Sequence, residues 1–343
     1  MPKSSPENFN YLYPMNNFKH IFFVLILGFA LFSQSLAQEN RIYLDDDLLV
    51  SGIDLHIHND NWIIYDRFQQ KIYLINPENG ELIREIHSDY IHPGFSWLPI
   101  IIRPLDEAIF VVNSAPFGFY IGYKNEFLNE LDMDFEATGT LLFTQDYMLG
   151  FYVNLDFTPE IRVMDMEGKV TRSFEVDLKF PLLDYRMEEL VMHLFRDKII
   201  IGSPNQNEIH IYGLDGTKQR TILLESDYFI EPSRDLSRTS NAREIGELME
   251  EFFRVKRNTS DIMNSFMVAD NEFLVYIRHN KTNLFEYLLI NLDTNEQRSQ
   301  TIPYPDDGYL TLAQDGKLYF TWYHGEKTFI EIKTLSDIFS SYR

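Results

Sequence analysis

The chain contains no cysteine among its 343 residues. A disulfide bond, a thiol nucleophile and the lipid-anchored cysteine of a bacterial lipoprotein are therefore all excluded. A protein without disulfides depends on its apolar core for stability, and a chain of this length can bury a large core. Hydrophobic residues make up 45% of the sequence and aromatic residues 15%, which favours an all-β globular protein.

Positive charge is scarce. The chain has 30 lysine and arginine residues against 52 acidic residues, and its formal net charge is −22 at pH 7. Such an excess of negative charge repels phosphate backbones and anionic lipid surfaces. We therefore expect no nucleic-acid partner, whereas the same excess leaves calcium binding open.

No apolar run is long enough for a comfortable membrane span, which needs about 20 residues. The longest run extends from Ile21 to Phe32 and is interrupted only by Gly28. It follows the basic Lys19 and precedes small residues at Ser35 and Ala37. This arrangement is typical of a secretory signal peptide, cut here between Ala37 and Gln38.

We therefore expect residues 1–37 to be a signal peptide and residues 38–343 to form one domain. The mature protein would be periplasmic or extracellular and would have no membrane span. Met15 is an alternative start that would give the signal an ordinary length. An uncleaved amino-terminal anchor is the alternative interpretation.

An aspartate followed by a short run of strand-forming residues recurs six times along the chain. The aspartates are Asp60, Asp106, Asp146, Asp197, Asp270 and Asp315, and successive copies lie 46, 40, 51, 73 and 45 residues apart. Aspartate suits a hairpin turn because its carboxylate accepts hydrogen bonds from backbone N–H groups two residues on. A four-stranded unit that repeats every roughly 40–50 residues is typical of a β-propeller, so six copies predict six blades.

A second turn recurs in phase with the first, at Asn76–Gly80, Met164–Lys169, Tyr212–Thr217 and Ile290–Asn295. Two turns in phase predict four strands in each unit. The predicted strands of the first unit are Ile53–His58, Trp62–Tyr65, Lys71–Ile75 and Leu82–Ile86. The next four units are predicted at residues 96–133, 139–178, 190–226 and 264–302.

The sixth unit, residues 308–336, has no clear outer strand. Its three predicted strands are Tyr309–Leu312, Leu318–Tyr323 and Phe329–Lys333. The strand-like segment Arg41–Leu44 has no place in the first unit. We expect it to complete the sixth unit, because a propeller has to close its ring and a paired edge resists aggregation.

The longest spacing contains an insertion, Ser226–Asp261. Apolar and acidic residues alternate in it at helical spacing, and the apolar positions are Ile245, Leu248, Met249, Phe252 and Phe253. This pattern predicts an amphipathic helix of about four turns. Its apolar stripe would pack on the propeller in one interpretation, and would form a lid or a docking surface in the other.

The repeated turns, the Gly-containing second hairpins and the export signal together resemble the TolB-like six-bladed β-propeller proteins of bacterial envelopes. The resemblance covers the whole mature chain and implies an all-β, six-bladed propeller with one helical insertion between the fourth and fifth blades. Propellers of known function include lactonase-like enzymes and exported binding proteins. They usually bind ligands over the central channel, on the face built by the loops between second and third strands and between blades.

The six aspartates belong to the opposite face of such a propeller. We therefore interpret them as structural turn residues, with a ring of metal-binding carboxylates as the alternative. The candidate ligand- or partner-binding residues lie in the loops of the expected face, and they are Asp66, Arg67, Tyr90, His92, Trp97, Asn113, Tyr185, Arg278, His279, Tyr323 and His324. Aromatic rings beside amide, carboxylate and guanidinium groups suit a sugar or a peptide.

Signals for catalysis are weak. The sequence has no Gly-x-Ser-x-Gly and no His-Glu-x-x-His motif. His56 and His58 alternate on one predicted strand and would share a face, but strand histidines more often pack between blades, as we expect also for His193. The only polar candidates near the starts of the inner strands are Asp54 and Asn264.

These observations favour a non-enzymatic exported protein, monomeric, that binds a protein or glycan partner and needs no cofactor. The alternative hypothesis is a metal-dependent lactonase- or hydrolase-like propeller enzyme with an acidic site in its central channel, where calcium is the expected ion. We expect no metal ligand under the first hypothesis, and the sequence leaves catalytic residues unknown.

Overall fold

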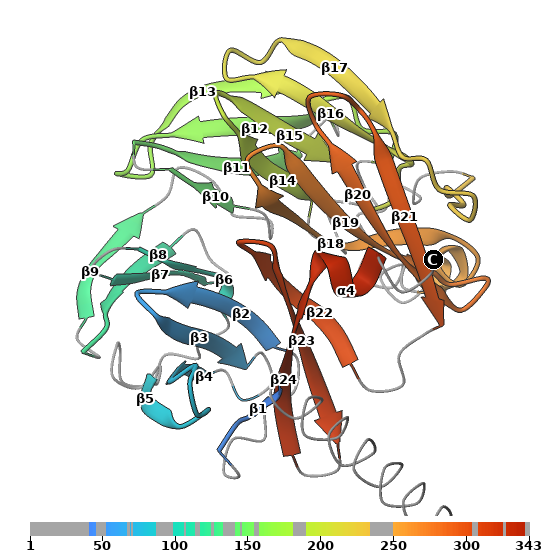
Figure 1. Ribbon diagram of the computed structural model, residues 1–343. Helices are drawn as coiled ribbons and strands as arrows, with labels where there is room; N and C mark the ends of the chain where they lie inside the picture. The colour runs from blue at the N-terminus through green and yellow to red at the C-terminus, as the bar shows by residue number, and fades with distance from the viewer. Residues whose placement is uncertain are drawn as a thin grey trace, which may run out of the picture. The chain divides into compact units, whose positions relative to one another are not determined.

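The structure is a computed structural model (Figure 1). By its internal contacts the chain divides into two units, Met1–Arg41 and Ile42–Arg343. The residues that the structure describes are 41–45, 53–66, 69, 71–86, 99–105, 108–113, 117–124, 127–132, 141–144, 146–153, 158–180, 190–233, 250–303, 308–324 and 327–339. The predicted signal peptide lies outside the described residues.

The described strands form six four-stranded antiparallel sheets. The first consists of β2 (Ile53–His58), β3 (Asn61–Asp66), β4 (Lys71–Ile75) and β5 (Leu82–Ile86), and the second of β6 (Pro99–Pro104), β7 (Ala108–Asn113), β8 (Phe117–Gly122) and β9 (Phe127–Asp132). The third consists of β10 (Leu141–Phe143), β11 (Met148–Val153), β12 (Pro159–Met164) and β13 (Val170–Glu175).

The fourth sheet consists of β14 (Val191–Phe195), β15 (Lys198–Gly202), β16 (Glu208–Gly213) and β17 (Lys218–Leu223), and the fifth of β18 (Ser260–Ala269), β19 (Glu272–His279), β20 (Leu284–Asn291) and β21 (Gln297–Pro303). The sixth combines β22 (Gly308–Gln314), β23 (Lys317–His324) and β24 (Lys327–Thr334) with β1 (Arg41–Tyr43). The chain order of each of the first five sheets is a simple meander.

The first strands of most neighbouring sheets contact one another. Contacts join β2 to β6, β10 to β14, β14 to β18 and β18 to β22, and a further contact joins β22 back to β2. Figure 1 shows the sheets following one another in chain order around a common centre. The expectation of an all-β propeller arrangement is therefore confirmed.

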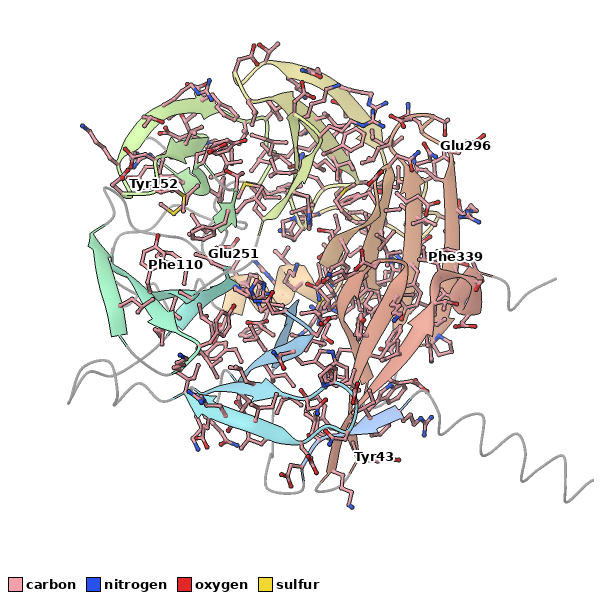
Figure 2. All side chains as sticks on the ribbon, turned by 60° about the vertical axis from the view of Figure 1, so that its left-hand side comes forward. Tyr43, Phe110, Tyr152, Glu251, Glu296 and Phe339 are labelled. Atoms are coloured by element: carbon pink, nitrogen blue, oxygen red, sulfur yellow. The ribbon has the colours of Figure 1, made fainter. Side chains whose placement is uncertain are left out.

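The hydrophobic core lies between adjacent sheets. One cluster, for example, joins Ile200 and Ile211 of the fourth sheet to Val275 and Leu288 of the fifth. Figure 2 shows side chains filling the spaces between neighbouring sheets, with Phe110 on β7 near the start of the third sheet. The middle strands read as nearly continuous apolar runs because both of their faces are covered, and each fully buried Ile or Phe contributes about 1.5–3 kcal/mol.

The segment β1 completes the sixth sheet, as the sequence predicts for Arg41–Leu44. It pairs with β24, and the Leu44 N–H donates to the Thr328 carbonyl at 3.0 Å. The Asp45 N–H donates to the Gly80 carbonyl at 3.3 Å, in the last turn of the first sheet. Leu44 is buried in a cluster with Trp62 of the first sheet and Ile330 of the sixth. This short segment therefore joins the sixth sheet to the first.

The repeated turns have the geometry that their residues favour. In the first hairpin Asn59 and Asp60 have φ of 48° and 60°, and in the last Asp315 and Gly316 have φ of 51° and 72°. Two successive residues with positive φ are typical of the type I′ hairpin turn. These aspartates are therefore turn residues, while Asp106 lies outside the described residues.

The second hairpins share one hydrogen-bond pattern. The Asp165 carboxylate accepts N–H bonds from Glu167 at 3.1 Å and from Lys169 at 2.9 Å, and Gly168 follows with φ of 83°. Asn76 and Asn291 hold the corresponding position in the first and fifth sheets and accept in the same way. In the fourth sheet Gly213 holds this position, and Asp215 accepts the Thr217 N–H instead. Asp and Asn are used here because their side chains replace backbone acceptors in the turn.

Two predicted boundaries are wrong. The fifth sheet begins at Ser260 rather than at residue 264, so the insertion ends earlier than Asp261. The extension is possible because a β-bulge between Ile262 and Asn264 shifts the register and lets Asp261 pair with Arg278. The sequence also gives no warning of α4 (Leu335–Phe339), whose first turn is capped.

The predicted helix of the insertion is only partly described. Residues 250–256 are helical, while 234–249 lie outside the described residues. Phe252 is half-buried, but Phe253, which the sequence pattern places on the buried stripe, is 52% exposed. The expectation of burial at Phe253 is therefore wrong, because the helix turns this side chain to solvent one position after Phe252.

Replacing Gly80 by alanine tests the role of β1. An added Cβ at Gly80 would overlap the Tyr43 carbonyl oxygen, whereas one at Gly316 meets no atom within 4 Å, and both glycines have positive φ. We expect Gly316→Ala to lower the free energy of unfolding by about 1–2 kcal/mol from backbone strain alone. Gly80→Ala should lower it by at least ~1 kcal/mol more, because it also displaces β1. Equal losses in urea unfolding would contradict this role.

Candidate functional site

Polar side chains converge on the loop side of the fourth and fifth sheets. The segments that meet there are the connection between β15 and β16, the turn between β19 and β20, and the crossing from β17 to β18. This is the face on which the sequence predicts binding. We define the loop-face cluster as Asn205, Lys256, Ser260, Asp261, Arg278, His279, Asn280 and Glu286.

A buried carboxylate organises one half of the loop-face cluster. Asp261, whose side chain is only 3% exposed, lies 2.8 Å from Nη2 of Arg278 and 3.7 Å from Nζ of Lys256. It also accepts a hydrogen bond from Nδ2 of Asn280 at 2.6 Å. The Lys256 ammonium, 8% exposed, donates to Oδ1 of Asn205 at 2.9 Å. These ion pairs and hydrogen bonds compensate the charges of Asp261 and Lys256, which would otherwise be costly to bury.

Arg278 connects this buried cluster to solvent. Its side chain is 29% exposed, and Asp261 accepts from both Nε, at 3.4 Å, and Nη2. A guanidinium carries five N–H donors in a fixed plane. Asp261 uses the Nε edge, so the Nη1 side of the group is turned away from its carboxylate partner. The arrangement fixes the orientation of a cation at the protein surface.

The other half of the loop-face cluster is a chain of hydrogen bonds. The Ser260 hydroxyl lies 2.9 Å from Nδ1 of His279, and Nε2 of His279 lies 3.0 Å from the Glu286 carboxylate. All three residues are buried. Hydroxyl, imidazole and carboxylate in this order could activate a serine for nucleophilic attack.

The Ser260 hydroxyl is, however, occupied by structural contacts. It accepts the Ile230 N–H at 3.0 Å and lies 3.2 Å from the Tyr228 carbonyl. The centroid of the Tyr228 ring lies 5.8 Å from that of His279. These bonds attach the chain after β17 to the start of β18. The geometry therefore favours a structural role for this hydroxyl rather than attack on a substrate.

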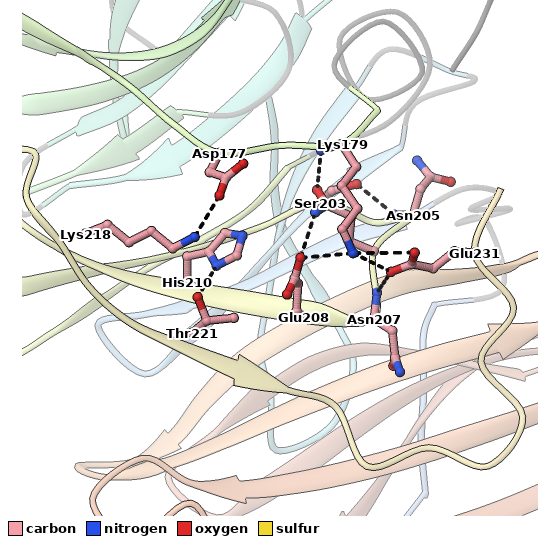
Figure 3. Close-up of polar contacts among 11 residues, drawn as sticks. Asp177, Lys179, Ser203, Asn205, Asn207, Glu208, His210, Lys218, Thr221 and Glu231 are labelled. Atoms are coloured by element: carbon pink, nitrogen blue, oxygen red, sulfur yellow. Dashed lines mark hydrogen bonds and ion pairs between the residues drawn. The ribbon is translucent and has the colours of Figure 1, made fainter. Parts of the chain in front are cut away.

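Ion pairs attach the same crossing segment to the fourth sheet (Figure 3). The Lys179 ammonium lies 3.0 Å from Glu208 and 3.1 Å from Glu231, and Glu231 also accepts the Asn207 N–H at 2.9 Å. Burial opposes the charge on Lys179, but the two carboxylates outweigh it and raise the pKa of the lysine. Because Lys179 is well exposed, we expect each pair to contribute little individually.

His210 is a buried titratable group below this network (Figure 3). Its Nδ1 lies 3.0 Å from the Thr221 hydroxyl, and Lys218 and Asp177 form an ion pair nearby at 2.8 Å. Burial lowers the pKa of His210, and the positive charge of Lys218 lowers it further. The imidazole is therefore neutral at physiological pH.

Two of the predicted binding residues, Arg278 and His279, lie in the loop-face cluster. Asp66 does not: it is fully buried and accepts the Gln69 N–H at 2.8 Å within its own turn. The Tyr323 ring lies 6.4 Å from that of Tyr309 on the sixth sheet.

The structure describes the other predicted binding residues less fully. Asn113 ends β7 and His324 ends β23. The remaining ones lie outside the described residues, namely Arg67, Tyr90, His92, Trp97 and Tyr185. They stay predictions.

Sequence reasoning missed Lys256, Ser260 and Asp261 because it assigned them to the insertion. The polar run before Ile262 gives no period-two pattern, which is the usual sign of a strand. The one available signal was Asp261 itself, an acidic residue directly before an apolar residue at the end of a helical pattern.

The histidines considered as metal ligands make other contacts. The His193 ring lies 2.8 Å from the Ser265 hydroxyl and so joins the fourth sheet to the fifth. The His58 ring stacks on Tyr123 at 5.5 Å. Within the described ranges, no group of three or more His, Asp or Glu side chains is arranged to hold a metal ion. In the same ranges no helix has the length and apolar character needed to cross a membrane.

Comparisons with known proteins find similarity in fold. No protein-family model and no curated protein sequence matches the chain. A member of the DUF4221 family from Bacteroides vulgatus superposes with a TM-score of 0.56 at 11% identity, covering 86% of this chain and 96% of that one. A candidate exported protein from Bacteroides fragilis superposes with a TM-score of 0.55 at 12% identity, covering 86% of this chain and 94% of that one. At such low identity these similarities show the propeller fold alone.

Replacing Asp261 by asparagine tests the buried charge cluster. The variant leaves Lys256 and Arg278 without their shared carboxylate, so we expect the free energy of unfolding to fall by about 3 kcal/mol. Asp293→Asn is the matched control, because Asp293 pairs with Arg196 at 2.9 Å on the exposed turns of the opposite face. The control should unfold in urea like the unaltered protein. Similar behaviour of the two variants would contradict the structural role of Asp261.

Lowering the pH tests the buried neutral His210. An unfolded histidine takes up a proton below pH about 6.5, whereas the folded protein keeps the His210 pKa lower. The unfolded state then binds more protons, so stability falls as the pH drops below about 6.5. We expect His210→Gln to lose less stability over this range in thermal melts. An unchanged pH dependence would assign the acid sensitivity to other groups.

Proposed function

We propose that the protein is an exported, non-enzymatic binding protein that presents a ligand- or partner-binding propeller face. The observation that carries this proposal is Arg278: a buried Asp261 holds it in a fixed orientation, and part of its side chain remains exposed on the loop face. Stability alone does not require this arrangement, because a buried ion pair contributes little net stability compared with apolar packing of similar volume. A pre-oriented cation is suited to recognition.

The export part of the proposal rests on the sequence. The apolar run before Ala37 favours a cleaved signal peptide, which would leave residues 38–343 as a monomeric periplasmic or extracellular domain. We also propose that the six four-stranded sheets act as six blades of a TolB-like propeller, with β1 as the outer strand of the sixth. The fold similarity to a candidate exported protein is consistent with this location.

Binding is favoured over the alternative of a metal-dependent lactonase- or hydrolase-like enzyme. Asn264, one of the two polar candidates near the channel, donates its side-chain amide to the Leu310 carbonyl at 3.0 Å and so joins the fifth sheet to the sixth. The serine in the loop-face cluster is likewise engaged by Ile230 and Tyr228. Asn264 and Ser260, two polar groups that could act in catalysis, thus already have structural tasks.

The proposal can be tested with the mature chain on glycan and peptide arrays. We expect one class of ligand to bind, and Arg278→Gln to lose that binding. Arg196→Gln should retain it, because Arg196 is an aspartate-paired arginine on the opposite face. Equal loss in both variants, or no binding on either array, would contradict the proposal. Calcium-dependent hydrolysis of a lactone series, abolished by a chelator, would support the enzyme instead.

A further inference from the structure

The segments that carry and adjoin Arg278 contain further cations, in a protein whose net charge is −22. Lys256 shares the buried Asp261 with Arg278, and Lys281 follows Asn280 on the exposed turn between β19 and β20. Arg254 and Arg257 lie exposed at the end of the helical segment 250–256, which supplies Lys256. Asn280 connects the two elements, since its side chain donates to the Thr259 carbonyl at 3.1 Å.

The helix explains part of this positive charge. Lysine and arginine are stabilising in the last turn of a helix, where the helix dipole is negative. Arg254 also lies 3.8 Å from Glu251, which offsets its charge. Neither explanation applies to Arg278 and Lys281, because they belong to a strand end and a turn. Arg278 also compensates the buried Asp261, whereas its Nη1 side and Lys281 are not explained by these contacts.

We propose that Arg278 binds a carboxylate group of the ligand, with Lys281 as a supporting charge. This inference rests on the proposed function and names the chemistry of the same face. Asp261 occupies the Nε edge of the guanidinium, and the described contacts of Arg278 leave Nη1 for an incoming group. Arginine binds a planar carboxylate through two parallel N–H bonds, and the group is already oriented before the ligand arrives.

The overall charge balance favours a carboxylate over a phosphate. Asp261 offsets the charge of Arg278, and the net charge of −22 repels a dianion about twice as strongly as a monoanion. The overall negative charge of the protein also opposes a long polyanion. The ligand is therefore a short molecule with few carboxylates, whose source is an acidic oligosaccharide or an acidic peptide.

Calorimetric titration of the mature chain tests this inference. The probes are trigalacturonate and a glutamate tripeptide with acetylated and amidated ends, each compared with its carboxylate-free counterpart, the trimethyl ester and the glutamine tripeptide with the same blocked ends. Inorganic phosphate is a further probe. We expect one acidic probe to bind, its neutral counterpart to bind at least tenfold more weakly, and the binding to weaken with added salt. Which acidic probe binds identifies the source of the carboxylate.

Variants assign the binding to Arg278. Arg278→Gln should weaken the acidic probe by at least about tenfold, and Arg278→Lys by less, because lysine keeps the charge but loses the paired N–H bonds. Lys281→Gln alters an exposed residue outside the buried cluster and should weaken binding severalfold, which keeps the test valid if Arg278→Gln folds poorly. Arg196→Gln should bind as the unaltered protein does.

Failure of the inference differs from failure of the proposed function. If array ligands bind in an Arg278-dependent way but are neutral, or if phosphate binds more tightly than both acidic probes, the carboxylate inference is overturned and the binding function stands. The same holds if Arg278→Gln and Lys281→Gln both bind the acidic probes as tightly as the unaltered protein does. No binding of any probe or array ligand overturns both.

Discussion

The pairing of β1 with β24 is the contact on which the arrangement of the sheets depends. Each sheet buries its faces against two neighbours, so the first and last sheets need each other as much as any other pair. Leu44 supplies both a hydrogen bond to the sixth sheet and an apolar side chain between the sixth and the first. The following N–H at Asp45 reaches Gly80 of the first sheet. The three residues of β1 and the two residues that follow it thus serve two sheets.

On the loop face a single charged side chain likewise joins two elements. Asp261 joins Lys256 of the helical segment to Arg278 of β19, so one carboxylate fixes an insertion and a sheet at once. Buried ion pairs contribute little net stability compared with apolar packing, but they specify which groups must meet. The interaction therefore explains how an insertion that interrupts the repeat is held in a defined place.

Turn chemistry made much of the fold predictable. Asn59-Asp60 and Asp315-Gly316 specify type I′ turns locally, and Asp165 and Gly168 specify the second hairpin, so strand positions followed from a few residues. The strands β2, β4 and β5 begin and end where the sequence predicts. The start of β18 was not predictable in this way, because Ser260 and Asp261 are polar and are buried only through partners far away in the sequence. The same holds for the site, where Arg278 was recognisable as a loop cation but Asp261 was not.

The position of β1 has a consequence for folding kinetics. Leu44 bonds to Thr328, so the contact joins residues 284 positions apart, whereas each hairpin joins residues a few positions apart. Loop-closure entropy makes this contact about 1.7 kcal/mol more costly than closing a loop of roughly 40 residues. Folding rates fall as contacts become less local. The hairpins are therefore expected to form early and in any order. The β1–β24 pair is expected to form last, so the edge of β24 stays unpaired until the end of folding.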